Sequence, residues 1–127
     1  MKTEEKLYAQ HAEHSEWISK LKFYEDEISI MKNRLSEIVS KNSHKDVLSQ
    51  AEHFQNQLIV QKNNIDEISH TIIIDEDVIQ KEIGKNPLST DLRKKRTHAD
   101  EKIAVESFEK NFNKLRAAFN EFAVKWM

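Results

Sequence analysis

The sequence contains no cysteine, and among its 127 residues it has one glycine and one proline. The absence of cysteine excludes a disulfide scaffold, cysteine-ligated zinc and thiol chemistry. So few backbone breakers, in a chain of which 33% of the residues are charged, are typical of long helices rather than of sheets or loops. The sequence therefore predicts an all-α protein, and its length suits a single domain over residues 1–127.

The sequence also lacks a long apolar run and an excess of positive charge. No stretch approaches the roughly 20 apolar residues of a membrane span, and the charged residues 1–6 do not resemble a secretory signal. A net charge of −2 offers no broad basic field for a phosphate backbone. We therefore expect a cytoplasmic protein that binds neither nucleic acid nor membranes.

Helix-breaking and helix-capping residues occur at two places and divide the chain into three segments of similar length. At the first break, Ser43 and Asp46 are spaced as in an N-terminal capping box. The second break supplies Gly84 as a helix C-cap, Pro87 as a residue that ends helical continuity, and Asn86, Ser89 and Thr90 as possible N-caps, so the third helix should begin between residues 86 and 90. The expected helices span about residues 3–41, 44–83 and 89–126.

Apolar residues recur at spacings of three and four in each segment, which is the pattern of a helix with one buried face. Long helices joined by short loops run antiparallel to their neighbours. The sequence therefore predicts an elongated, antiparallel up-down-up three-helix bundle with coiled-coil-like seams.

Short loops also predict which residues face each other. Leu35 should face Ala51 across the first hairpin, and Phe54 should face Phe119 across the second. Tyr24 and Gln61 fall in one layer in the middle of the bundle, where a hydrogen bond between phenol and amide is expected.

The same register places Asp75 opposite both His11 and His98 near one end of the bundle. His14 continues the core position of Leu7 and Leu21, whereas His11 is assigned to a second core position with Ile18 and Val39. The predicted polar layer consists of His11, His14, Asp75, His98 and Glu101.

Imidazole and carboxylate groups are suitable ligands for one divalent transition metal such as zinc, iron or manganese, and helical bundles hold such sites between facing helices. The alternative is a hydrogen-bonded network without metal, in which buried histidines donate to carboxylates. The sequence leaves both interpretations open.

The second helix carries apolar residues beyond its core stripe. These residues, Ile59, Val60, Ile73 and Ile74, should be partly exposed and form a candidate surface for a protein partner or a second copy of the chain. The basic run Arg93–Arg96 is expected to form ion pairs with acidic residues of the second helix.

Catalytic motifs are absent from the sequence. It contains no Gly-rich phosphate loop, no nucleophile elbow and no His-Glu-x-x-His motif, and it lacks the two inward Glu-x-x-His pairs of ferritin-like di-iron bundles. We therefore expect a non-enzymatic interaction or structural protein, whose second helix would bind a protein partner or a second copy of the chain. The alternative is a small metal-binding bundle that uses the polar layer.

Overall fold

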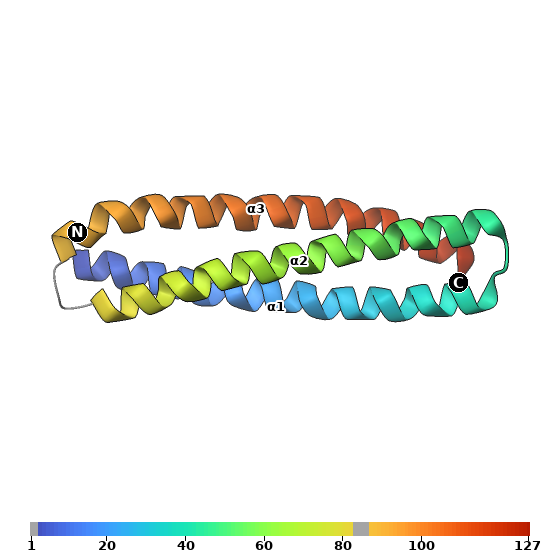
Figure 1. The fold of residues 1–127 in the computed structure, drawn as a ribbon, viewed down its shortest axis with the longest axis horizontal. Coiled ribbons are helices and arrows are strands. Elements are labelled where there is room, and N and C mark those ends of the chain that lie inside the picture. Colours follow the sequence, from blue (N-terminus) through green and yellow to red (C-terminus); the bar gives the residue numbers. More distant parts are fainter. Residues whose placement is uncertain (1–2, 83–86) are drawn as a thin grey trace.

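The chain folds into three long helices that pack side by side (Figure 1). The computed structural model describes the backbone of residues 3–82 and 87–127, and the side chains of residues 5–81 and 98–127. The helices are α1 (Thr3–Lys41), α2 (Lys45–Glu82) and α3 (Pro87–Trp126). Each helix contacts both others, and neighbours along the chain run antiparallel. The predicted all-α, elongated up-down-up bundle is therefore confirmed.

The start of α2 differs in detail from the predicted capping box. The helix begins at Lys45, and the backbone N–H of Asp46 donates to Nδ1 of His44 at 3.2 Å. The assignment of Ser43 as the cap was therefore wrong, because the helix starts one residue later than that motif requires. His44 fills the capping position with its ring nitrogen.

The end of α1 is tied to the last turn of α3. The side-chain amide of Asn42 donates to the carbonyl of Ile38 at 2.8 Å and to that of Trp126 at 3.2 Å. At the opposite end of the bundle, α3 begins at Pro87, inside the predicted interval. The predicted C-cap Gly84 and the side chains of the basic run Arg93–Arg96 lie outside the described residues.

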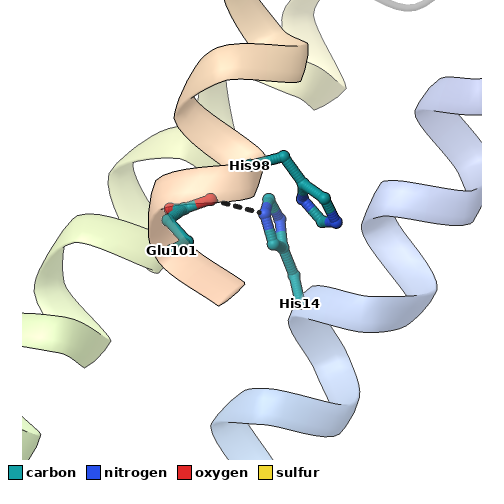
Figure 2. Close-up of side chains that lie close together, drawn as sticks. All are labelled: His14, His98 and Glu101. Atoms are coloured by element: carbon teal, nitrogen blue, oxygen red, sulfur yellow. Dashed lines mark hydrogen bonds and ion pairs between the residues drawn. The ribbon is translucent and has the colours of Figure 1, made fainter. Parts of the chain in front are cut away.

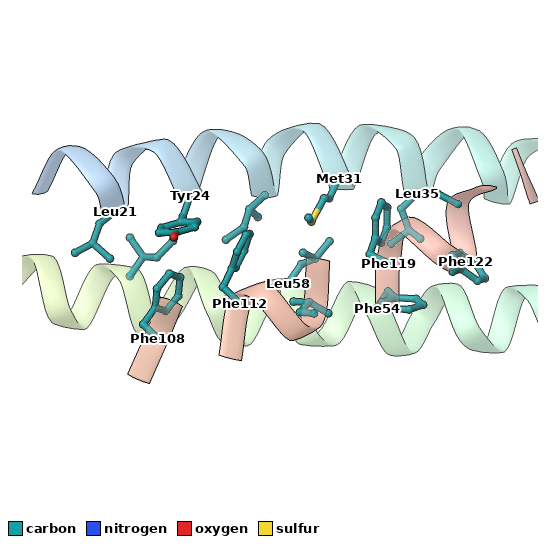
Figure 3. Close-up of a cluster of buried hydrophobic side chains, with 14 of the residues drawn as sticks. Leu21, Tyr24, Met31, Leu35, Phe54, Leu58, Phe108, Phe112, Phe119 and Phe122 are labelled. Atoms are coloured by element: carbon teal, nitrogen blue, oxygen red, sulfur yellow. The ribbon is translucent and has the colours of Figure 1, made fainter. Parts of the chain in front are cut away.

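The core is continuous, and its buried positions are separated alternately by three and four residues in every helix (Figure 3). In α1 the second core position is that of Gln10, Trp17 and Tyr24, which differs from the prediction. Val39 of the predicted second position is instead 43% exposed. Residues three and four positions after Leu7 both lie near its face of the helix, and the one three positions on, Gln10, is the one that is buried. The other members of this position are Met31 and Ile38.

The register agrees with the prediction in the half of the bundle that holds Phe54, whereas at the other end His11 contacts Glu76 and not the predicted Asp75. The rings of Phe54 and Phe119 meet edge to face with their centroids 5.5 Å apart. Leu35 and Ala51 line one groove between α1 and α2.

The predicted hydrogen bond between Tyr24 and Gln61 is wrong. The Tyr24 hydroxyl donates instead to Oε2 of Glu109 at 2.9 Å, on the side of α1 that faces α3. Oε1 of Gln61 is buried without a hydrogen-bond partner. The hydroxyl group of Tyr24 therefore finds its hydrogen-bond acceptor on the parallel helix α3 and not on α2.

No helix in the described part of the chain is long and apolar enough to cross a membrane. The expected cytoplasmic location stays a prediction.

Candidate functional site

Near the N-terminal end of α1, the core positions of all three helices are occupied by polar side chains. His14 comes from α1, Asp75 from α2, and His98 and Glu101 from α3; we refer to these four residues as the polar layer. His14 is 1% exposed, and Asp75 and Glu101 are each 4% exposed. Regular core spacing points these side chains inward, because each continues a stripe that is mostly apolar elsewhere in its helix.

His14 lies at the centre of the polar layer and contacts three carboxylates. Its Nδ1 is 2.8 Å from Oε1 of Glu76. Its Nε2 is 3.1 Å from Oε1 of Glu101 and 3.4 Å from Oδ2 of Asp75. A neutral imidazole has only one N–H, so it can donate on only one of these two sides. A further cation, either a proton or a metal ion, is needed on the other side.

In the metal-free protein a proton serves as this cation. Burial is the largest single influence on the pKa of His14 and lowers it, but hydrogen bonds to Asp75, Glu101 and Glu76 together raise the pKa to about 10. His14 is therefore an imidazolium at neutral pH when no metal is bound.

The surrounding carboxyl groups respond to the same contacts. Burial raises the pKa of Glu101, and its proximity to Asp75 raises it further, against the opposing effect of His14. Burial also acts to raise the pKa of Glu76, but hydrogen bonds from Gln80, His14 and His11 outweigh it and lower the pKa. Glu76 is thus a fixed negative charge beside His14.

His98 brings a second imidazole to the polar layer (Figure 2). Its ring stacks on Trp17 with the centroids 4.7 Å apart, and lies 5.2 Å from the ring of His14. Its Nε2 is 3.0 Å from Oε1 of Glu13, whereas its Nδ1 is buried without a hydrogen-bond partner. When Nε2–H donates to Glu13, Nδ1 is left with a free lone pair in the interior.

One donor atom from each of His14, His98 and Glu101 lies within 4.8 Å of the other two. Together with Asp75, which contacts His14, these are four of the five residues that the sequence assigned to a metal site. The fifth, His11, is not in the interior. Its side chain is 45% exposed, and its Nδ1 lies 2.5 Å from Oε2 of Glu76. It was misplaced because it belongs to the margin of α1 and not to its second core position.

Two contributing residues, Glu76 and Glu13, were missed by the sequence reasoning. Neither occupies a core position, and each reaches a histidine of another helix from beside the core. Glu76 directly follows Asp75, and Glu13 directly precedes His14. Acidic residues next to inward polar residues are the available sequence signal.

The four apolar residues of the predicted interaction surface are exposed on α2. Their exposed fractions are 44% for Ile59, 53% for Val60, 58% for Ile73 and 52% for Ile74. They therefore lie outside the core, as the seven-residue pattern of α2 requires.

Comparison with known proteins found no matching family, no matching curated protein and no matching solved structure. Function is therefore inferred from the geometry of the polar layer and of the α2 surface.

Proposed function

We propose that this protein is a non-enzymatic bundle that binds one divalent transition metal ion in the polar layer. The ligands are Nε2 of His14, Nδ1 of His98 and a carboxylate oxygen of Glu101, with Asp75 as the fourth donor. The observation that carries the proposal is the approach of one donor atom from each of the first three residues to within 4.8 Å of the others. Bundle cores hold metals by this kind of convergence from facing helices.

The second ring nitrogen of each histidine supports the proposal. Metal-bound histidines usually donate their other N–H to a carboxylate or carbonyl, which fixes the tautomer and the ring orientation. Here Glu76 forms a hydrogen bond with Nδ1 of His14, and Glu13 forms one with Nε2 of His98. Both imidazoles are thereby prepared to present their remaining nitrogen to a cation.

The spacing of the donors is also suitable for a metal. Ligands at about 2.1 Å from a tetrahedral ion are about 3.4 Å apart. Nε2 of His14 is 3.1 Å from Glu101 and 3.4 Å from Asp75, so these two pairs of donors already have this spacing. Mixed imidazole and carboxylate donors favour zinc, iron, cobalt or manganese, whereas magnesium and calcium prefer oxygen ligands.

Metal content and cobalt spectroscopy test the proposal. Protein purified without a histidine tag is expected to retain or take up about one equivalent of zinc or cobalt, and bound Co²⁺ should show the visible absorption of a site with imidazole ligands. His98→Gln should abolish this uptake. His53→Gln, which changes an exposed histidine far from the polar layer, is the matched control. Less than about a tenth of an equivalent and no cobalt spectrum in the unmodified protein would contradict the proposal.

A second candidate function is self-association through α2, which is favoured by the exposure of Ile59, Val60, Ile73 and Ile74. The two pairs lie two heptads apart, on either side of Asp66 and Glu67. When the α2 helices of two copies pack antiparallel, Ile59 and Val60 of one copy meet Ile73 and Ile74 of the other. This self-complementarity is that of a two-fold symmetric dimer.

Light scattering across a concentration series tests this second function. We expect dimers that dissociate on Ile73→Glu substitution, because a buried unpaired charge opposes the contact. A strict monomer at about 100 μM would contradict it, since useful self-association needs a dissociation constant below that range.

A further inference from the structure

The polar layer borders two surface grooves. One groove, of about 390 Å³, lies between α2 and α3, and the other, of about 300 Å³, lies between α1 and α2. The first is lined by Glu67, Ile68, Thr71, Asp100, Glu101 and Ala104. The second is lined by His14, Ser15, Ile18, Ile72, Ile73 and Glu76.

The groove between α1 and α2 is obstructed on the side of the polar layer. Glu76, which supplies a carboxylate to this groove, contacts His14, His11 and Gln80. This contact engages Nδ1 of His14, which is not the proposed donor nitrogen. A cation arriving from this side would have to break the contacts that orient the imidazole.

The groove between α2 and α3 leads instead to the proposed donors. Among the residues whose side chains the structure describes, it is lined by three carboxylates and by no cationic side chain. Glu67 and Asp100 are exposed, and among the described side chains neither forms an ion pair. No side chain in the described part of the chain therefore neutralises these two charges.

Glu101 connects this groove to the interior. Although it lines the groove, its side chain is only 4% exposed. Its Oε1 contacts Nε2 of His14, and its Oε2 is buried without a hydrogen-bond partner. An unsatisfied carboxylate oxygen at this position can accept a cation from the groove and pass it to the histidines.

We infer that the metal ion enters the polar layer through the groove between α2 and α3, and that Glu67 and Asp100 capture it there. This inference rests on the proposed metal-binding function. Two carboxylates beside a low-dielectric wall raise the local concentration of cations and speed their association. The same field is screened by salt, so its effect is largest at low ionic strength.

Stopped-flow measurement of Co²⁺ association tests the inference. Trp17 stacks on His98 and reports binding by fluorescence, and a Trp126→Phe background leaves it as the only tryptophan. The double variant Glu67→Gln/Asp100→Asn should bind Co²⁺ on the order of tenfold more slowly at low salt. The difference should shrink as salt is added. The matched control Asp26→Asn/Glu121→Gln removes the same charge from exposed positions elsewhere and should bind at the parent rate.

The two proposals fail in different ways in this experiment. Equal association rates for the double variant and its control, with bound Co²⁺ in both, would overturn the access route and leave the metal site standing. No fluorescence change and no bound Co²⁺ in the Trp126→Phe parent would overturn the metal site and the access route with it.

Discussion

His14 is buried among three carboxylates, and its protonation controls the polar layer at the scale of single residues. Asp75 and Glu101 both contact its Nε2, and Glu76 forms a hydrogen bond with its Nδ1. Removing one partner of a buried charged group leaves the remaining charges unpaired in the interior. The free-energy cost of these unpaired charges exceeds the net stabilisation that the original interaction provides. The layer is therefore sensitive to pH and to single substitutions.

The stability of the metal-free protein should fall as the solution becomes alkaline. The pKa of His14 is raised from 6.5 to about 10. A raised pKa means that the stabilisation is complete below the unfolded value near 6.5 and is lost as pH rises through about 10. Urea unfolding in the presence of a chelator should show a loss of a few kcal/mol over this interval. His14→Gln should remove this dependence, whereas His53→Gln should keep it.

Asp75→Asn should lower the pKa of His14, because the hydrogen bond to Asp75 is the strongest of the influences that raise it. NMR titration of the ring nitrogens in metal-free protein measures this change. Glu52→Gln, an exposed change on the same helix, serves as the control. An unchanged titration of His14 in Asp75→Asn would show that Asp75 does not contact the ring in solution.

At the scale of the helices, the sequence predicted the core stripes of α2 and α3 correctly, including the inward positions of Asp75 and Glu101. It assigned His11 to the core of α1 because apolar spacing alone does not separate residues three and four positions along a helix. Glu76 and Glu13 were not predicted because they reach the layer from beside the core, where no periodicity marks them. The hydrogen bond from Tyr24 to Glu109 was not predicted, because the predicted register pairs only helices that are joined by a loop. It makes no statement about the contact between α1 and α3.

Gln61→Leu should stabilise the protein. Gln61 continues the core stripe of α2, and its Oε1 is buried without a hydrogen-bond partner. A leucine there removes the cost of the unsatisfied oxygen, which is about 1–3 kcal/mol. Urea unfolding at pH 7 should show an increase of about 1 kcal/mol or more. A decrease would mean that the amide makes a compensating contact in solution.

Across the whole molecule, the two ends of the bundle have different cores. One end holds the polar layer, and the other is filled by aromatic side chains such as Phe54, Phe119 and Phe122. Because the layer joins all three helices, the proposed metal ion would act on the end of the bundle that holds the polar layer. The aromatic end should be nearly indifferent to metal.

Hydrogen exchange should reveal this asymmetry. Added Zn²⁺ is expected to slow amide exchange around His14, Asp75 and Glu101 more than around Phe54 and Phe119, because a ligand that binds only the folded state suppresses the local opening of its site. Uniform protection, or protection confined to the aromatic end, would place the ion elsewhere.

The most direct measurement of the central claim is a crystal structure of protein grown with Zn²⁺, with anomalous data collected on both sides of the zinc edge. We predict one strong anomalous peak in the polar layer, at about 2.1 Å from Nε2 of His14 and from Nδ1 of His98, with Glu101 completing the contact. A structure without a peak between these three residues, or with zinc only at exposed histidines such as His44 or His70, would contradict the claim.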